Sequence, residues 1–282
     1  MGKILGLLLA IIALATVYMF LSRDWFPAVI SEHGPAIDAQ FKRTLFVVGV
    51  AFTLAQLALG YAVFRFGRRG KERAVYTHGS NKLEATWTIV TAAVFITLAV
   101  MGQMVWADMH LRPAPADSVK INLVAQQFQF TFHYPGADQE FGRTDPNLID
   151  DSSLNYVGLD AEGDPKAADD IQSTTMVIPV NRPVEVTLRS KDVIHNFFVP
   201  QLRFKQDTVP GMAVKIHFKA TQTGKYEVVC AELCGQLHYN MRTAVIVVDQ
   251  EEYDRMSAMP KQEFTQRLGE LSSSTPVSGQ VQ

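Results

Sequence analysis

The sequence predicts a membrane α-helical hairpin, with a further apolar segment ahead of it, followed by an all-β domain. Two observations support this fold class. The hydrophobic residues of the 282-residue chain are concentrated in three apolar runs that end before residue 110. From about residue 117 onward, short runs of β-forming residues alternate with turn residues. The net charge of −2 gives no overall indication of nucleic-acid binding.

The second and third apolar runs have the length of membrane-spanning helices. They cover residues 44–64 and 86–107, and neither contains a charged side chain. At a rise of about 1.5 Å per residue, each spans roughly 30 Å, the thickness of the hydrocarbon core of a bilayer. We therefore expect a two-helix transmembrane hairpin over residues 44–107.

Basic residues are concentrated in the connection between these two runs. There are six: Arg65, Arg68, Arg69, Lys71, Arg73 and Lys82. The stretch 22–43 ahead of the hairpin carries only Arg23, Lys42 and Arg43. The positive-inside rule therefore places the connection in the cytoplasm and everything after Ala107 on the outer side.

The first apolar run, within residues 1–22, permits two interpretations. Lys3 followed by the apolar run Ile4–Leu21 is typical of a secretory signal peptide. However, the run is longer than the usual apolar region of such a peptide, about 7–15 residues, and no small-x-small cleavage site follows closely. We prefer an extra, uncleaved transmembrane helix. Both interpretations leave the β domain outside.

The remainder of the chain, over residues 115–255, is expected to form the exported domain. Seven segments have a β-like pattern: Val119–Val124, Gln127–Tyr134, Thr175–Pro179, Pro183–Arg189, Ala213–Phe218, Lys225–Val229 and Thr243–Asp249. Short strands punctuated by Pro and Gly predict a β-sandwich or a Greek-key barrel. The tail over residues 268–282 lacks aromatic residues, and we expect it to be disordered.

Both cysteines of the chain lie in one short stretch together with other soft metal donors. The stretch runs from Cys230 through Cys234 and His238 to Met241. Thiolate, imidazole and thioether donors suit copper, whereas magnesium and calcium prefer oxygen. A zinc site with four thiolates is excluded within this chain, because a second pair of cysteines is missing. Two thiolates on one loop can instead bridge two copper ions.

A further ligand is expected from a separate loop. His195 lies between two apolar runs and follows the strand-like segment 184–188. Met241 and the backbone carbonyl of Glu232 are candidates for weak axial donors. Asp192 and Asn196 flank His195, and we expect them to hold the histidine ligands in orientation.

These residues resemble subunit II of the haem–copper cytochrome c oxidases, whose dinuclear copper centre is called CuA. The family pattern is a His-containing loop followed by Cys-x-Glu-x-Cys-x3-His-x2-Met, and every position is filled here. The resemblance implies a cupredoxin-like fold and two copper ions. The implied ligands are His195, Cys230, Glu232, Cys234, His238 and Met241. It also implies that the Glu232 side chain helps to hold a magnesium or manganese ion shared with subunit I.

The resemblance also implies a function. Reduced cytochrome c would give electrons to the copper pair, and these would pass to haem in subunit I of a proton-pumping oxidase, where oxygen is reduced to water. We expect this chain to be non-catalytic alone and to assemble with subunit I, which holds haem and copper, and with subunit III. The expected location is the bacterial inner membrane, as a multi-pass protein in contact with lipid, with the copper domain on the periplasmic side.

Two further residues correspond less closely to family positions. Phe128 falls where the family has a tryptophan that receives electrons; the alternative is ordinary strand packing. Glu84, at the cytoplasmic start of the third run, resembles a family glutamate at the mouth of a proton-uptake channel. The alternative is a solvated acid at the membrane interface.

An acidic insertion interrupts the β pattern at residues 137–170. It contains ten acidic and two basic residues, a local charge of −8. One interpretation is a solvated surface insertion, and the other is a docking surface for a basic cytochrome c.

Other classes of protein are less favoured but stay open. A CuA-containing subunit of a nitric oxide reductase-like complex would share the copper loop. A membrane-anchored copper chaperone would need a βαβ pattern around its cysteines. Cys230 and Cys234 could also form a disulfide in an oxidising compartment.

Overall fold

The computed structural model describes residues 2–23, 25–67, 76 and 78–278, and it divides into two compact units. The first unit comprises Met1–Phe26 and Ala36–Asp108, and the second comprises Pro27–Pro35 and Met109–Gln282. Residues 27–33 of the segment that connects the first two helices thus belong to the β unit. Ile30 in this segment is buried in the β core, and its backbone N–H donates to the carbonyl of Gln201 at 2.9 Å.

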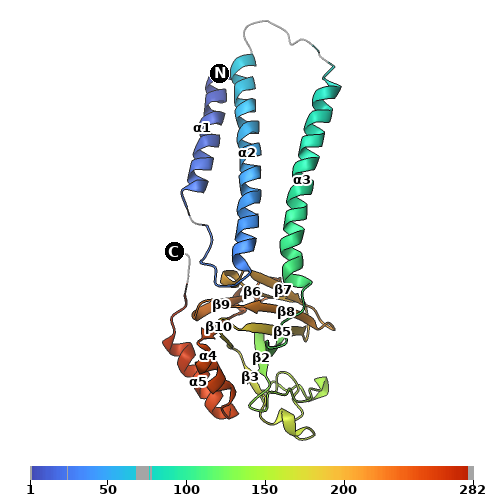
Figure 1. Cartoon of the computed structure of the whole chain (residues 1–282), viewed down its shortest axis with the longest axis vertical. Coiled ribbons are helices and arrows are strands. Elements are labelled where there is room, and N and C mark those ends of the chain that lie inside the picture. The colour runs from blue at the N-terminus through green and yellow to red at the C-terminus, as the bar shows by residue number, and fades with distance from the viewer. Residues whose placement is uncertain (1, 24, 68–75, 77, 279–282) are drawn as a thin grey trace. The chain divides into compact units, whose positions relative to one another are not determined.

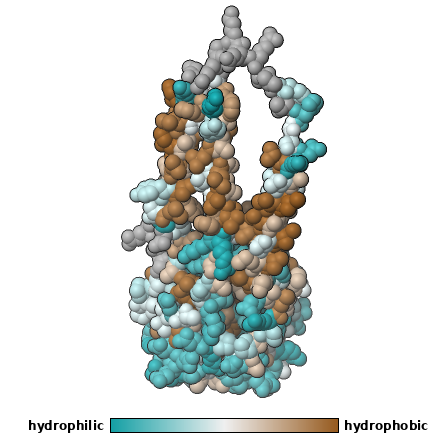
Figure 2. All heavy atoms as spheres, turned by 45° about the horizontal axis from the view of Figure 1, so that its top comes forward, coloured by the Kyte–Doolittle hydropathy of each residue, from teal (hydrophilic) through white to brown (hydrophobic). Residues whose placement is uncertain are grey.

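The first unit consists of three helices, α1 (Gly2–Leu21), α2 (Gly34–Phe66) and α3 (Asn81–His110) (Figure 1). All three are long and apolar enough to cross a membrane, by length and composition. Their large apolar side chains are mostly exposed, and Figure 2 shows this hydrophobic surface along the helices. Such a surface requires a lipid environment, because soluble proteins seldom expose apolar patches of this extent.

The helical hairpin lies where the sequence predicts it, and its helices are longer than the apolar runs. Polar residues at both ends of α2 and α3 continue the backbone hydrogen bonding beyond the expected membrane core. The orientation stays a prediction. Of the basic residues on which it depends, Arg68, Arg69, Lys71 and Arg73 lie outside the described residues.

The first apolar run forms a helix that packs closely on α2. A Cβ atom placed on Gly6 would lie 2.5 Å from the carbonyl oxygen of Gly60, so the two backbones are in direct contact. Small residues allow this close approach in membrane helix pairs. Whether residues 1–22 are a cleaved signal peptide or an extra transmembrane helix stays a prediction, because helix formation is compatible with both interpretations.

The second unit is a sandwich of two five-stranded sheets. One sheet has the order β3-β2-β1-β5-β8 and the other β4-β10-β9-β6-β7. The strands are β1 (Val119–Gln126), β2 (Gln129–Tyr134), β3 (Ile171–Ser173), β4 (Met176–Pro179), β5 (Pro183–Ser190), β6 (His195–Val199), β7 (Phe204–Thr208), β8 (Val214–Lys219), β9 (Gly224–Cys230) and β10 (Arg242–Val248). The β1–β5 and β4–β10 pairs are parallel and the others antiparallel.

Strand alternation explains how these sequences fill the interior of the sandwich. In β5, the residues Val184, Val186 and Leu188 are fully buried, and the intervening side chains are partly exposed. Phe197 and Val199 of β6 contribute to the core from the opposite sheet. All seven predicted strands are present. The sequence pattern did not indicate β3, β6 and β7, because they are short or contain polar residues.

The prediction of a disordered tail over residues 268–282 is wrong for its first part. Two helices, α4 (Gln250–Ser257) and α5 (Lys261–Ser274), follow β10. Leu268 and Phe264 of α5 are buried in the core, and the ring of Phe264 lies 5.4 Å from that of Tyr134. An amphipathic face therefore orders this helix without any aromatic residue after Phe264. Residues 279–282 lie outside the described residues.

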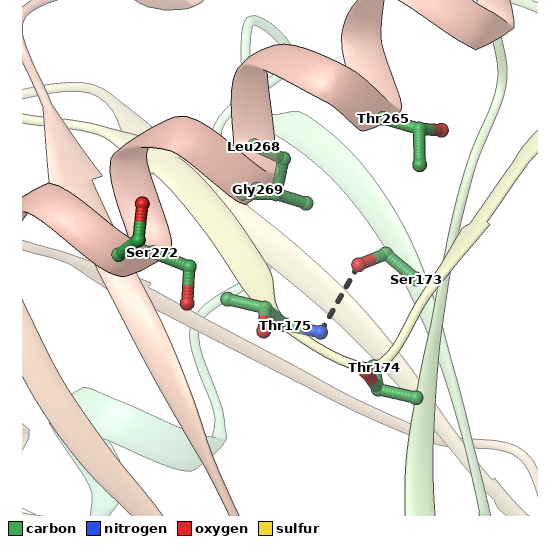
Figure 3. Close-up of a pocket in the computed structure, with 8 residues that line it drawn as sticks. Ser173, Thr174, Thr175, Thr265, Leu268, Gly269 and Ser272 are labelled. Carbon is green, nitrogen blue, oxygen red and sulfur yellow. Dashed lines mark hydrogen bonds between the residues drawn. The ribbon is translucent and has the colours of Figure 1, made fainter.

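A small pocket separates α5 from the segment that joins β3 and β4 (Figure 3). Hydroxyl groups dominate its lining, which consists of Ser173, Thr174, Thr175, Thr265, Leu268, Gly269, Ser272 and Ser273. None of these residues is charged or a soft metal donor. The pocket therefore has no part in the metal chemistry described below.

The acidic insertion is folded by its own carboxylates. Asp145 and Asp164 cap two short 3-10 helices, η1 (Pro146–Leu148) and η2 (Pro165–Ala167). At the end of the insertion, the Asp170 carboxylate meets His133 Nε2 at 2.6 Å, and both side chains are buried. Several carboxylates of the insertion therefore accept hydrogen bonds that order this surface segment, and the segment keeps its negative charge.

Candidate metal centre

The predicted metal donors converge because strands β6 and β9 are neighbours. Phe197 of β6 pairs with Cys230, the last residue of β9. His195 lies two residues before Phe197, on the same side of the strand, and therefore comes close to Cys230. One nitrogen of His195 and the sulfur atoms of Cys230 and Cys234 lie within 4.8 Å of one another.

The loop that carries the other donors is closed by backbone hydrogen bonds. The Cys230 N–H donates to the carbonyl of Met241 at 3.0 Å, so the first and last donors sit at the two ends of one loop. Within it, the His238 N–H donates to the carbonyl of Gly235 at 3.1 Å, and residues His238–Asn240 form a 3-10 turn. Because β9 and β10 pair from Arg242 onward, the loop is held at both ends by a sheet.

Distances within the loop agree with a compact site centred on Cys234. Its Sγ lies 3.9 Å from Cys230 Sγ, 3.6 Å from His238 Nδ1 and 3.7 Å from Met241 Sδ. The Glu232 carbonyl oxygen lies 3.2 Å from Cys230 Sγ. Both cysteines are free, so the disulfide alternative is not the state described here. The structure thus brings together every predicted ligand.

The two nitrogens of His195 have different environments. Nε2 lies 2.8 Å from the Asp192 carboxylate, as predicted for an orienting residue. Nδ1 is buried without a hydrogen-bond partner. A buried, unpartnered polar atom is costly unless something binds it. Since one nitrogen of this ring lies in a cluster with two sulfur atoms, a metal with soft and borderline ligands fits this position.

The two thiols differ in acidity. Burial alone would raise the pKa of Cys230, but the neighbouring His195 side chain and the backbone N–H of Asn196 lower this pKa to about 6. Burial and the adjacent Cys230 thiolate raise the pKa of Cys234 to about 12. The metal-free pair therefore holds a single proton at neutral pH, and a bound cation would displace it.

The prediction for Asn196 is wrong with respect to its side chain. Its Nδ2 donates to Asp207 at 2.6 Å, across the β6–β7 pair, and does not orient a histidine. The contribution of Asn196 comes from its backbone, which faces Cys230. Side-chain direction depends on the strand pairing, and β6 and β7 were not predicted.

Phe128 lies beside the loop that runs from Cys230 to Met241. Gln127, the residue before it, belongs to the site and was missed in the sequence analysis. A Cβ atom added to Gly235 would come within 3.0 Å of the Phe128 ring, so ring and loop are in contact. Gln127 Nε2 donates to the carbonyl of Cys234 at 2.5 Å. Its position next to Phe128 could have indicated a place in the site, but a polar residue in a turn is normally solvated.

The remaining predicted residues lie apart from the donors. The Glu232 side chain is exposed and only its backbone carbonyl faces the sulfur atoms. Glu84 is in the first turn of α3, in the helical unit. Their expected roles stay predictions.

Comparison with known proteins agrees with the fold. The family model for the periplasmic domain of cytochrome c oxidase subunit II matches residues 119–249, and the model for its transmembrane domain matches residues 26–104. The "Alternative cytochrome c oxidase subunit 2" of Bradyrhizobium diazoefficiens is 35% identical over 250 residues, covering 88% of each chain.

The chain belongs to the cytochrome c oxidase subunit II family. The cytochrome c oxidase subunit 2 of Thermostichus vulcanus is 33% identical over 256 residues, which cover 81% of this chain and 76% of that protein. Among solved structures, the periplasmic domain of subunit II (CoxB) of Bradyrhizobium japonicum aligns with 54% of this chain and 99% of its own, at 26% identity and a TM-score of 0.39.

Membership of the subunit II family has two direct consequences. The chain is part of an oxidoreductase complex and associates with other oxidase subunits. Its apolar helices anchor a domain of the periplasmic type. The cupredoxin-like fold expected from the resemblance is confirmed by the two-sheet sandwich and by the family match.

Proposed function

We propose that this chain is the electron-accepting subunit of a proton-pumping cytochrome c oxidase. In this function it binds two copper ions at a CuA centre, receives electrons from cytochrome c and delivers them to haem in subunit I. The observation that carries the proposal is the cluster formed by His195, Cys230 and Cys234. His238 and Met241 join it through their contacts with the Cys234 sulfur.

The protein would contribute to electron transfer by holding the copper ligands in fixed positions. A copper pair bound between two thiolates would share one electron over both metals, so that the ligand distances change little when it is reduced. The loop supports this because β9 and β10 hold its ends and the Cys230–Met241 backbone hydrogen bond closes it. Asp192 fixes the ring of His195 through Nε2, which leaves Nδ1 free for metal.

Phe128 is proposed as the contact through which electrons arrive. Its ring is half-buried and touches the loop at Gly235, directly after Cys234. It therefore lies between solvent and the donor cluster. A Phe128→Leu variant should slow reduction by cytochrome c while the copper spectrum is unchanged.

The chaperone alternative is not supported by the surroundings of the cysteines. These residues follow strand β9 and precede strand β10 of an antiparallel pair, with no βαβ arrangement among the described residues around them. A nitric oxide reductase-like complex would share the copper loop. The match of the transmembrane model over residues 26–104 favours the oxidase.

Several finer assignments belong to the same proposal. The chain would lie in the bacterial inner membrane as a multi-pass protein, with the β domain in the periplasm. The exposed Glu232 side chain would contribute to a magnesium or manganese site shared with subunit I, and subunit III would complete the complex. Glu84 would serve proton uptake, so Glu84→Gln should slow turnover while copper reduction by cytochrome c stays intact.

Electron paramagnetic resonance of the full-length chain, purified with its oxidase subunits, tests this function. We expect the hyperfine pattern of one unpaired electron shared equally by two copper nuclei. Cys230→Ser should abolish this pattern. The pattern of a single isolated copper in the unsubstituted protein would refute the proposal.

A further inference from the structure

The turn between β1 and β2 forms hydrogen bonds with both loops that carry candidate metal donors. These are the histidine loop, which joins β5 to β6 and leads into His195, and the cysteine loop, which runs from Cys230 to Met241. The backbone N–H of Gln127 donates to Asp192 Oδ2 at 2.7 Å, on the histidine loop. Its side chain donates through Nε2 to the carbonyl of Cys234 at 2.5 Å, on the cysteine loop. A single residue thus connects two segments that are far apart in the sequence.

On the histidine side, the connection continues to a metal donor. Asp192 Oδ1 accepts from the Val193 N–H at 2.7 Å and lies 2.8 Å from His195 Nε2, while Oδ2 is occupied by Gln127. All of these contacts hold the carboxylate in one orientation. The position of the His195 ring therefore depends on where the backbone of Gln127 lies.

On the cysteine side, the contact is direct and tight. Gly235 has a positive φ of 140°, and a Cβ atom there would lie 2.7 Å from Gln127 Nε2 and 3.0 Å from the Phe128 ring. Glycine is therefore required for the turn to approach the Cys234–Gly235 peptide. The side-chain amide can then reach the Cys234 carbonyl.

Strand pairing fixes the distance between the two loops only where they leave the sheet. The ladder between β6 and β9 joins Phe197 to Cys230, where the loops leave the sheet. Cys234 lies four residues beyond this point, and Asp192 lies before β6 begins. The bonds of Gln127 act between these outer parts.

We propose that Gln127 is a positioning residue that sets the separation of His195 from Cys234, so that the donor cluster is preorganised for its metals. This inference rests on the proposed dinuclear copper site. Groups that orient metal ligands in this way typically change metal affinity by roughly 10–100-fold when they are removed.

The test uses the complete oxidase with Gln127→Met, which keeps the length of the side chain and removes its donor. Gln129→Met is the matched control, because Gln129 lies in the same hairpin and its amide bonds only to Thr131 among the described contacts. Two quantities are measured: the rate at which a Cu(I) chelator removes copper, and the copper hyperfine splitting. Thermal unfolding of the copper-free protein reports on the fold.

For Gln127→Met we expect copper loss roughly 10–100-fold faster than in the unsubstituted protein and an altered hyperfine splitting, with unfolding like that of Gln129→Met. Unchanged copper loss and splitting would overturn the inference. So would a lowered unfolding temperature with an unchanged splitting, since that describes a purely structural role. If Gln127→Met does not accumulate, Gln127→Glu is measured in the same way. Absence of a copper pair from the unsubstituted oxidase would instead refute the proposed function, and this inference with it.

Discussion

The Asp192 carboxylate lies 2.8 Å from Nε2 of His195, and this contact leaves Nδ1 of the same ring buried and without a hydrogen-bond partner. The carboxylate therefore selects the ring nitrogen that is available for metal. Because it also accepts from the backbone of Val193 and Gln127, it orients the ring before any metal binds.

Replacing Asp192 should weaken the metal site without unfolding the domain. Asp192→Ala removes the acceptor for His195 Nε2, so the ring loses its fixed orientation. We expect copper affinity to fall by roughly 10–100-fold. Competition with a Cu(I) chelator measures this, and the exposed Asp117→Ala is the control. Equal affinity of both variants would show that Asp192 does not orient the ring.

Copper binding should depend on pH through Cys234. Both thiols must be deprotonated to bind copper, and the pKa of Cys234 is raised to about 12 by burial and the Cys230 thiolate. At about pH 8, where Cys230 with its pKa of about 6 is already ionised, binding should release about one proton from this pair.

Acidification should weaken copper binding, because the proton on Cys234 competes with copper. Affinity should fall by about tenfold for each pH unit by which the solution is acidified, and more steeply below about pH 6, where Cys230 is protonated too. Titration of the copper-free protein in weak buffer with a pH indicator measures the released proton. Binding without proton release would mean that both thiols are ionised beforehand.

The buried pair of His133 and Asp170 should be important for stability. Both side chains are almost fully buried, at 2% and 0% exposure, and Asp170 Oδ2 also accepts from the Gly142 N–H at 2.9 Å. Asp170→Ala leaves His133 Nε2 buried without its partner, which typically costs about 1–3 kcal/mol in the free energy of unfolding.

The same change should release the acidic insertion from β2. Limited proteolysis should therefore cut residues 137–170 faster in Asp170→Ala, and chemical denaturation should report the lost stability. Glu162→Ala, an exposed acidic residue of the same insertion, is the control and should behave like the unsubstituted protein. If both variants are equally stable, the pair does not anchor the insertion.

The docking role of the insertion can be tested by removing charge while keeping the fold. Asp138, Glu140, Asp151 and Glu162 are exposed, so their amide replacements should be tolerated. If the insertion steers a basic cytochrome c, KM for that donor should rise at low salt, and the difference should vanish at high salt. Four amides at Glu251, Asp254, Glu263 and Glu270, which are exposed on α4 and α5, provide a control of equal charge.

The clustering of the candidate metal donors could be predicted from the sequence, because spacing within one loop limits where side chains can lie. Cys230, Cys234, His238 and Met241 belong to one closed loop, and uncharged runs of sufficient length predict membrane helices directly. Contacts across the sandwich could not be predicted in this way. Gln127 meets Cys234 and Asp170 meets His133 only because the two sheets and the insertion pack in a particular register.

Strand detection failed for a related reason. β6 and β7 are ordered by pairing with each other and with β9, and their polar residues hide the alternation that predicts a strand. The wrong prediction for Asn196 follows from this, because its side chain faces β7. The helix α5 was missed because its apolar face is narrow, with Phe264 and Leu268 as its buried residues.

The number of copper ions held by each chain tests the central claim most directly. Elemental analysis of the purified oxidase, before and after Cys234→Ser, separates the copper of this chain from that of its partner subunit. The account predicts that the substitution removes two copper ions per chain. A loss of one ion, or of none, would contradict it.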